Sequence, residues 1–394
     1  MTATSKIIDT VEENVIHTYN RYPVALDHGE GMYLYDVEGK KYLDMGSGIG
    51  VFALGYGNED YNNAVKAQVD HLVHTSNYFY NAPAAEAAKK LVEASGMQKV
   101  FFTNSGAEAV EGALKLAKKY ALMKKGKKAY KIIAMEHSFH GRTIGSLSVT
   151  GNAHYRESFE PLMPGVCFAQ YNDLESVKAL MDENTACVIL ETIQGEGGIH
   201  PATREFLEGV RALCDEYDAL MILDEIQCGM GRSGSMFAFQ KFGLMPDVLT
   251  CAKALGCGVP IGAFCASPKV CDVLVAGDHG TTYGGNPLAC AAASVVFDLF
   301  KKNDLLANVN SVGAYLYERF ESLKKEYPQI IDHRGVGLIQ GLEFAEPVGP
   351  IIQKLLAEGV ITFAAGSNVI RFIPPLIIGR EQVDELMEIL KKVL

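Results

Sequence analysis

Short apolar runs alternate with amphipathic helical patterns along the middle of the chain, from about Ala84 onward. The runs are rich in branched residues and contain no regular polar alternation, which is typical of strands buried on both faces of a mainly parallel sheet. The helical patterns between them include Asn104–Met123 and Pro201–Tyr217. This order predicts an α/β fold built from right-handed crossover units. The predicted strands are KVFF (Lys99–Phe102), KIIAM (Lys131–Met135), ACVILE (Ala186–Glu191), ALMILDE (Ala219–Glu225) and DVLTCA (Asp247–Ala252).

The two ends of the chain show different patterns. The first eighty residues look irregular, except for a hairpin in GMYLYDVEGKKYLDM whose turn lies at Glu38-Gly39. Beyond about Asn286 the pattern is rich in helix and closes with a small sheet (GVGLIQGLEF and VIRFIPPL) and a helix at Glu381–Val393. We therefore predict a large domain over residues 51–285. A smaller α+β domain would combine residues 1–50 with residues 286–394.

Composition narrows the class of protein. A net charge of −11 over 394 residues argues against a nucleic-acid surface, and a hydrophobic fraction of 48% suffices for a large core. No stretch approaches the ~18 uninterrupted apolar residues of a membrane span, and the N-terminus lacks a signal core, so we expect a cytoplasmic protein. The nine cysteines form no C-x-x-C pair. They are therefore expected to be reduced core thiols, and no metal site is predicted.

Three candidate groups lie at or just beyond the ends of predicted strands, where open α/β sheets bind ligands. Ser105, Gly106 and Ala107 open a helix and could bind a phosphate with free N–H groups; the alternative is an ordinary helix cap. Asp224 could pair with a protonated ring nitrogen, as in pyridoxal enzymes, or could be a structural ion pair. Burial would lower the pKa of Lys253 and favour Schiff-base chemistry; the alternative is a lysine reaching the surface.

Four further residues suggest a substrate pocket. Phe139 offers a flat face for a pyridine ring, and Arg142 offers a bidentate fork for a carboxylate. Arg371 is a second such fork in a strand-like setting, where an unpaired guanidinium would be costly. Glu196 stands on a glycine-rich loop and could pair with either arginine. For each residue taken alone, the alternative is a structural role.

Taken together, six sequence blocks resemble the class III aminotransferases of pyridoxal-phosphate fold type I, in the order and spacing of that family. The resemblance runs from about Tyr19 to Arg371 and is strongest to the acetylornithine/ornithine group. It implies a fold type I transferase, pyridoxal 5′-phosphate as cofactor, and a homodimer with shared active sites. The blocks are SGAEA (Ser105–Ala109), FHGRT (Phe139–Thr143), ETIQGEGG (Glu191–Gly198), LDEIQCGMGRSG (Leu223–Gly234), CAKALG (Cys251–Gly256) and TTYGGNPLAC (Thr281–Cys290).

The resemblance also implies roles toward the cofactor. Lys253 would bond to it covalently and later carry a proton, and Asp224 would pair with the pyridinium nitrogen. Phe139 would stack on the ring, and Gln227 would contact the side of the ring hydroxyl. Thr282 would reach the phosphate of the neighbouring subunit. The full set of cofactor-binding residues that it implies is Ser105, Gly106, Ala107, Phe139, Glu191, Asp224, Ile226, Gln227, Lys253 and Thr282.

Five residues line up with the family's substrate positions. Arg142 would bind the distal carboxylate of the substrate, and Arg371 would bind the α-carboxylate of glutamate or 2-oxoglutarate. Glu196 would be the removable partner of Arg371. Tyr19 and Thr281 match positions on the substrate side.

Four departures from the family pattern bear on substrate preference and not on the reaction class. Thr192 replaces a usual proline, Cys257 a glycine and Thr281 a serine, and the loop Gly55–Asp60 lacks the family's common histidine-proline pattern. The leading hypothesis is transfer of the terminal amino group of N2-acetylornithine to 2-oxoglutarate, in arginine biosynthesis. Ornithine, succinyl-diaminopimelate and 4-aminobutyrate are alternative amino donors.

The alternatives from other classes are a fold-type I aminomutase and a non-catalytic pyridoxal-phosphate-binding protein. Arg142 with the Arg371/Glu196 pair argues against the mutase, which needs no second dicarboxylate substrate. The presence of Lys253, Asp224 and both arginines argues against a protein that only binds the cofactor.

Overall fold

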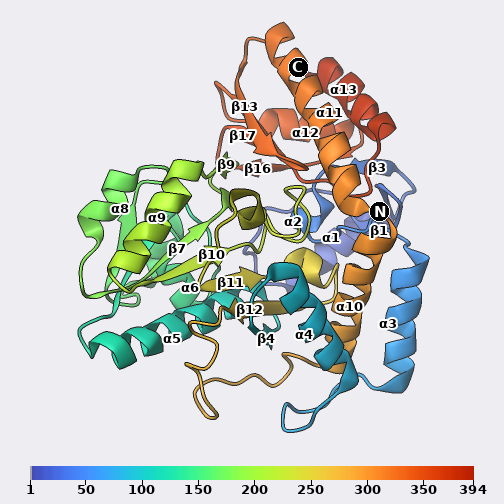
Figure 1. The fold of residues 1–394 in the computed structure, drawn as a ribbon. Helices are drawn as coiled ribbons and strands as arrows, with labels where there is room; N and C mark the ends of the chain where they lie inside the picture. The colour runs from blue at the N-terminus through green and yellow to red at the C-terminus, as the bar shows by residue number, and fades with distance from the viewer. Residues whose placement is uncertain (1) are drawn as a thin grey trace.

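A seven-stranded sheet lies at the centre of the computed structural model, which describes residues 2–394 (Figure 1). Its strand β12 is antiparallel to both neighbours, and the other neighbouring strands run parallel. The predicted α/β class and mainly parallel sheet are thus confirmed. In sheet order the strands are β4 (Lys99–Thr103), β12 (Gly262–Ala266), β11 (Val248–Cys251), β10 (Leu220–Asp224), β7 (Thr185–Glu191), β5 (Lys131–Met135) and β6 (Val166–Ala169).

Successive residues of the central strands face two different cores. On β7, Val188 belongs to a core that includes Phe206 of α9 (Arg204–Glu216). Its neighbour Cys187 belongs to a second core, which includes Val110 of α5 (Gly106–Lys125). Figure 1 shows the sheet between these two helices. Both faces are apolar, which is why the five predicted strands lack polar alternation.

The two predicted crossover helices are confirmed with slightly different ends. Ser105 caps α5, where its Oγ accepts a hydrogen bond from the N–H of Glu108 at 3.2 Å. Thr203 caps α9 in the same way, through the N–H of Phe206 at 3.2 Å. Such side-chain oxygens satisfy N–H groups that lack an acceptor in the first helical turn. The N-terminus of α5 therefore lies directly beyond β4.

The first eighty residues contain more structure than expected. The predicted hairpin forms from β2 (Tyr33–Asp36) and β3 (Lys41–Asp44), and β1 (Leu26–Glu30) extends it. However, helices α1 (Ala3–Asn14) and α3 (Glu59–His71) contradict the expectation of an irregular segment. The reason is that α1 buries no residue and α3 buries only Tyr61, so neither carries a strong apolar stripe.

The C-terminal part folds as predicted into an antiparallel sheet and a terminal helix. The sheet has the order β13 (Ile330–Val336), β14 (Ile339–Phe344), β17 (Val369–Phe372), β16 (Phe363–Ala365), and the last helix is α13 (Arg380–Val393).

Both chain ends meet in space, because β15 (Val360–Ile361) pairs in parallel with β3. The long helix α10 (Pro287–Lys302) belongs to the predicted small domain by sequence, but it packs against α3 and α4 (Ala82–Ser95), as Figure 1 shows. The domain boundaries at residues 50/51 and 285/286 stay a prediction. No helix within residues 2–394 is long and apolar enough to cross a membrane.

Candidate active site

A cavity of about 400 Å³ lies at the carboxyl ends of the central strands. Its wall comes from the segments that follow β4, β5, β7, β10 and β11, as expected for an open α/β sheet. Ten of the predicted site residues line it together, although they are spread over some 150 positions of sequence. They are Ser105, Gly106, Ala107, Phe139, Arg142, Glu191, Asp224, Ile226, Gln227 and Lys253.

Lys253 follows β11 and has a left-handed backbone, with φ of 50°. A non-glycine residue held in this region typically costs about 1–3 kcal/mol, so the surrounding fold must impose the conformation. Burial lowers the pKa of the Lys253 amine, while the nearby Glu196 carboxylate acts in the opposite direction. The amine forms no hydrogen bond or ion pair with residues 2–394. It is therefore a poorly solvated amine, suited to nucleophilic attack.

Asp224 ends β10 and is 3% exposed. One oxygen, Oδ1, accepts a hydrogen bond from the N–H of Ile226 at 3.0 Å. The other, Oδ2, lies 2.7 Å from Nδ1 of His140. Two fixed contacts leave the carboxylate immobile at the wall of the cavity, with lone pairs free for a cationic partner.

His140 is a residue of this site that the sequence interpretation missed. It is buried, and its Nε2 has no hydrogen-bond partner among residues 2–394. It also lines the cavity beside Phe139. The available signal was its place inside the block FHGRT, between two residues that were singled out. Nothing in the sequence paired it with Asp224, which lies 84 positions later.

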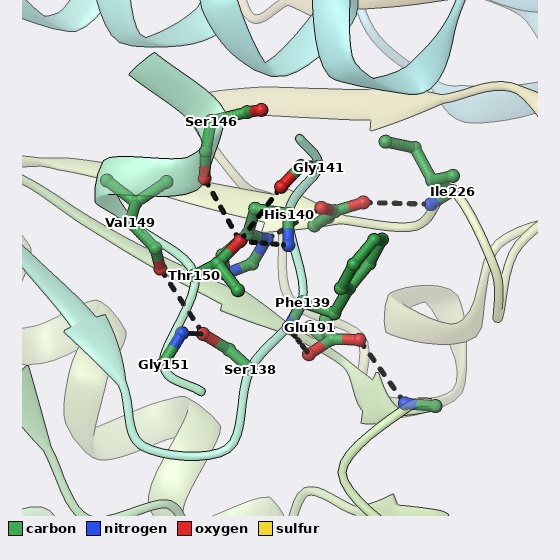
Figure 2. Close-up of polar contacts among 12 residues, drawn as sticks. Ser138, Phe139, His140, Gly141, Ser146, Val149, Thr150, Gly151, Glu191 and Ile226 are labelled. Carbon is green, nitrogen blue, oxygen red and sulfur yellow. Dashed lines mark hydrogen bonds and ion pairs between the residues drawn. The ribbon is translucent and has the colours of Figure 1, made fainter. Parts of the chain in front are cut away.

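Glu191 lines the cavity, and its carboxyl group is hydrogen-bonded to two separate segments of the chain, as Figure 2 shows. Its Oε2 accepts a hydrogen bond from the N–H of Phe139, and its Oε1 accepts one from the N–H of Gly195, both at 3.2 Å. The same figure shows the N–H of His140 donating to Oγ1 of Thr150 at 3.0 Å. Burial raises the pKa of Glu191 to about 7, with the His140 imidazole opposing the shift. The carboxyl group thus fixes the backbone of Phe139 and that of Gly195, the residue before Glu196.

Arg371 lies on β17, opposite Gly341 of β14, and is 2% exposed. Its Nη1 donates to Glu196 Oε1 and, at 2.9 Å, to Gln227 Oε1. Gln227 Nε2 donates to the same Glu196 oxygen at 3.0 Å. Although burial acts to raise the pKa of Glu196, the Arg371 guanidinium holds it below its ordinary value. These three residues form one polar triad beside the cavity.

Five predicted site residues do not line this cavity. Glu196 and Arg371 lie beside it in the triad with Gln227, and the other three are Thr281, Thr282 and Tyr19. Thr281 lies near the rim of the cavity, where its Oγ1 accepts a hydrogen bond from Asn104 Nδ2 at 3.2 Å. Thr282 is exposed and does not line the cavity. Tyr19 is 70% exposed and lines a different groove, together with α1. A single chain therefore does not bring Thr282 and Tyr19 to the other site residues.

Comparison with known proteins identifies the family, because residues 15–394 match the sequence profile of Aminotransferase class-III. The chain belongs to the class III aminotransferases. The acetylornithine aminotransferase of Clostridium acetobutylicum is 48% identical to this class III enzyme over 379 residues, which are 96% of this chain and 98% of the relative. That of Methanocaldococcus jannaschii is 44% identical over 390 residues, or 98% and 97% of the two chains.

A solved ornithine aminotransferase from Toxoplasma gondii has the same fold as this aminotransferase. Its TM-score is 0.94 at 32% identity, and the match covers 99% of this chain and 93% of that one. That protein is described with pyridoxal phosphate at partial occupancy in its active site. Class III aminotransferases depend on this cofactor, and so does this enzyme.

The cavity of this aminotransferase fits pyridoxal phosphate in its chemistry. The immobile carboxylate of Asp224 suits a protonated ring nitrogen, and the N-terminus of α5 suits a phosphate. The amine of Lys253 is available for a covalent bond, and the Phe139 ring forms a flat wall. The individual roles of these residues stay predictions.

Proposed function

We propose that this aminotransferase transfers the terminal amino group of N2-acetylornithine to 2-oxoglutarate and so forms glutamate. The observation that carries the proposal is that one of two arginines at the site has a carboxylate partner and the other has none among the residues described. Arg371 is buried and neutralised by Glu196, whereas Arg142 lines the cavity without a carboxylate partner in residues 2–394. The two relatives named acetylornithine aminotransferase support the choice of donor. We further propose that the enzyme is cytoplasmic and serves arginine biosynthesis.

The two substrates make different demands on the pocket. Glutamate reacts at its α-carbon, so its α-carboxylate lies beside the reacting atom and needs a cation there. Acetylornithine reacts at its terminal carbon, so the same place holds a methylene group. An unpaired Arg371 facing a methylene would be strongly unfavourable. Glu196 therefore neutralises Arg371 for acetylornithine and moves away for glutamate, while Arg142 binds the distal carboxylate of both.

Four groups of this chain would act on the cofactor. When bound, pyridoxal phosphate draws electron density from the substrate carbon, so that a proton can leave it. Lys253 would hold the cofactor through its amine and would carry a proton to and from that carbon. Asp224 holds a proton on the ring nitrogen, and His140 orients the Asp224 carboxylate. Phe139 covers one face of the ring, and the N–H groups that open α5 bind the phosphate.

A panel of amino donors tests the proposed substrate. Acetylornithine, ornithine, succinyl-diaminopimelate and 4-aminobutyrate would each be assayed with 2-oxoglutarate, and kcat/KM compared. We expect acetylornithine to have the highest value, and a higher value for any other donor contradicts the proposal. Amino transfer to 2-oxoglutarate also excludes both an aminomutase and a protein that only stores the cofactor, because neither consumes a second dicarboxylate substrate.

Replacement of Glu196 by alanine should change the balance between the two half-reactions. Arg371 would then be permanently free to bind the α-carboxylate of glutamate. The rate of the glutamate half-reaction should therefore rise relative to that of the acetylornithine half-reaction by at least about tenfold, because the loss of one buried charge pair is worth several kcal/mol. The measurement is the rate of each half-reaction, followed by cofactor absorbance. Glu196→Gln removes the charge with little change of shape and should act in the same direction. An unchanged ratio in both variants would exclude the switch.

We infer that the enzyme works as a homodimer in which Thr282 serves the partner's site. Large apolar side chains cluster in the exposed segment Tyr78–Tyr80, where Tyr78 is 94% and Phe79 70% exposed. Tyr283, next to Thr282, is 62% exposed. Exposed apolar groups of this size mark an interaction surface. A second copy of the chain is the occupant that would also explain why Thr282 lies outside its own cavity.

A hybrid dimer tests this arrangement. Thr282→Ala homodimers should bind pyridoxal phosphate about tenfold or more weakly, because a hydrogen bond to a charged phosphate is lost. In a hybrid of Thr282→Ala and Lys253→Ala subunits, one site receives Lys253 from one chain and Thr282 from the other. That site should bind the cofactor with wild-type affinity, measured by titration of the lysine-bound absorbance band. Weak binding in the hybrid would mean that Thr282 serves its own chain.

A further inference from the structure

The guanidinium of Arg142 rests on an aromatic ring that comes from a neighbouring segment. Its Cζ lies 3.7 Å from the centroid of the Tyr155 ring and 5.6 Å from that of Phe139. Within residues 2–394 it makes no hydrogen bond or ion pair, and Arg142 is exposed to solvent. The contact with Tyr155 is therefore the closest fixed interaction that its charged group has.

Tyr155 is itself held in place on both sides. Its ring meets Phe139 edge to face, with centroids 6.2 Å apart and planes at 86°. It belongs to the short helix α7 (Ala153–Arg156), where Oδ1 of Asn152 caps the N–H of His154 at 3.1 Å. The next residue, Arg156, lies 4.0 Å over the ring of Phe168 on β6. The Tyr155 ring thus packs against Phe139 of the cavity wall, while the Arg156 side chain links the same short helix to the edge strand β6.

A cation held by a ring face keeps all its donors free. An ion pair with a protein carboxylate would occupy the guanidinium N–H groups, whereas the π face accepts the charge without accepting a directed hydrogen bond. Arg142 is then restricted in position while its fork stays available for a substrate carboxylate. The long side chain of Arg142 is thus ordered before the substrate binds, and this reduces the entropy cost of binding.

We propose that Tyr155 is a positioning residue that sets the affinity of the enzyme for the distal carboxylate of its substrates, by holding Arg142 in a binding conformation. This inference rests on the proposed role of Arg142. Both substrates place a carboxylate at this end of the pocket. Loss of the ring should therefore weaken the binding of both substrates equally, in the ground state and in the transition state. Such uniform binding raises KM and leaves kcat unchanged.

The test compares variants that remove the ring with one that keeps it. Tyr155→Leu should raise the KM for 2-oxoglutarate about three- to thirtyfold at unchanged kcat, the range of a cation–π contact, and Tyr155→Met should do the same. Tyr155→Phe keeps the ring face and should stay within about twofold of wild type. Unlike Glu196→Ala, these variants should leave the ratio of the two half-reactions unchanged.

A binding measurement without turnover completes the test. Glutarate, an unreactive dicarboxylate, would be titrated into the holoenzyme by calorimetry, and its Kd should rise in Tyr155→Leu by the same factor as KM. In an Arg142→Ala background, Tyr155→Leu should have no further effect on glutarate. An equal loss in that background, or a loss in Tyr155→Phe as large as in Tyr155→Leu, overturns the proposal.

The same titration separates this inference from the proposed function. If Arg142→Ala leaves glutarate binding unchanged, Arg142 is not the carboxylate ligand, and both the proposed function and the role of Tyr155 are wrong. If Arg142→Ala weakens binding but Tyr155→Leu and Tyr155→Met do not, Arg142 keeps its role and only the inference about Tyr155 is overturned.

Discussion

Replacement of Lys253 by alanine should reduce transamination by at least about 10⁴-fold, the largest effect we expect from any single change. The residue has two proposed tasks, covalent attachment of the cofactor and proton transfer, and loss of a proton-transfer group alone costs about 10²–10⁴-fold. No nearby group can replace it, because no other lysine among the described residues lines the cavity. The assay is single-turnover conversion of glutamate at saturating cofactor.

Chemical trapping identifies the lysine independently of activity. Borohydride reduction of the holoenzyme followed by peptide mapping should place the cofactor on Lys253, and no labelled peptide should appear in Lys253→Ala. Lys99→Ala is the control, since Lys99 is half-exposed and paired with Asp272 on the protein surface. The Lys99→Ala enzyme should keep both the cofactor label on Lys253 and the wild-type rate of transamination. A cofactor label on a different lysine in the wild-type enzyme would refute the assignment.

Asp224→Asn should lower the rates of both half-reactions by about 10²–10³-fold. Asparagine occupies the same space but carries no charge, so it no longer stabilises a proton on the ring nitrogen. A positioned electrostatic partner in a buried site typically contributes this much. Both half-reactions should suffer alike, because the same carbon acidity is needed for each substrate. The measurement is the single-turnover rate with acetylornithine and, separately, with glutamate.

Asp247→Asn is a matched control for that experiment. Asp247 is also a buried aspartate, but it immediately precedes β11, whereas Lys253 and the cavity lie beyond the other end of that strand. It accepts hydrogen bonds from Arg211 Nη1 and from the N–H of Met221, both at 2.8 Å. Its replacement should lower the midpoint of thermal unfolding while the folded enzyme keeps its rates. Near-normal rates in Asp224→Asn would remove Asp224 from the proposed role.

The central sheet was largely predictable because its strands are buried on both faces. In β7 and β10 every residue is buried, so burial alone produces an unbroken apolar run. β6 and β12 were not predicted. β12 reads Gly-Ala-Phe-Cys-Ala, where small residues pack closely against neighbours without the branched side chains that indicate a strand. The helices α1 and α3 were missed for a related reason, since they bury too little to impose an apolar stripe.

The candidate site was predictable to the extent that its residues follow strands. Lys253, Asp224 and Glu191 come at or just beyond strand ends, and the topology of an α/β sheet brings such positions to one edge. The order of the sequence blocks then identified the family, which the comparison confirmed. The sequence by itself thus determined the fold class, the family and the location of the cavity.

Only the tertiary structure decided which side chains touch. The family resemblance had implied the pair of Glu196 and Arg371, which are 175 positions apart, and the structure shows that their side chains touch. The contact of Gln227 with both of them was not predicted. His140 meets Asp224, and Tyr155 lies beneath Arg142, through packing that leaves no periodic trace in the sequence. Periodicity records whether a residue is buried, because each element must cover its own apolar face. It carries no information about the partner, since side-chain contacts depend on how separate elements dock.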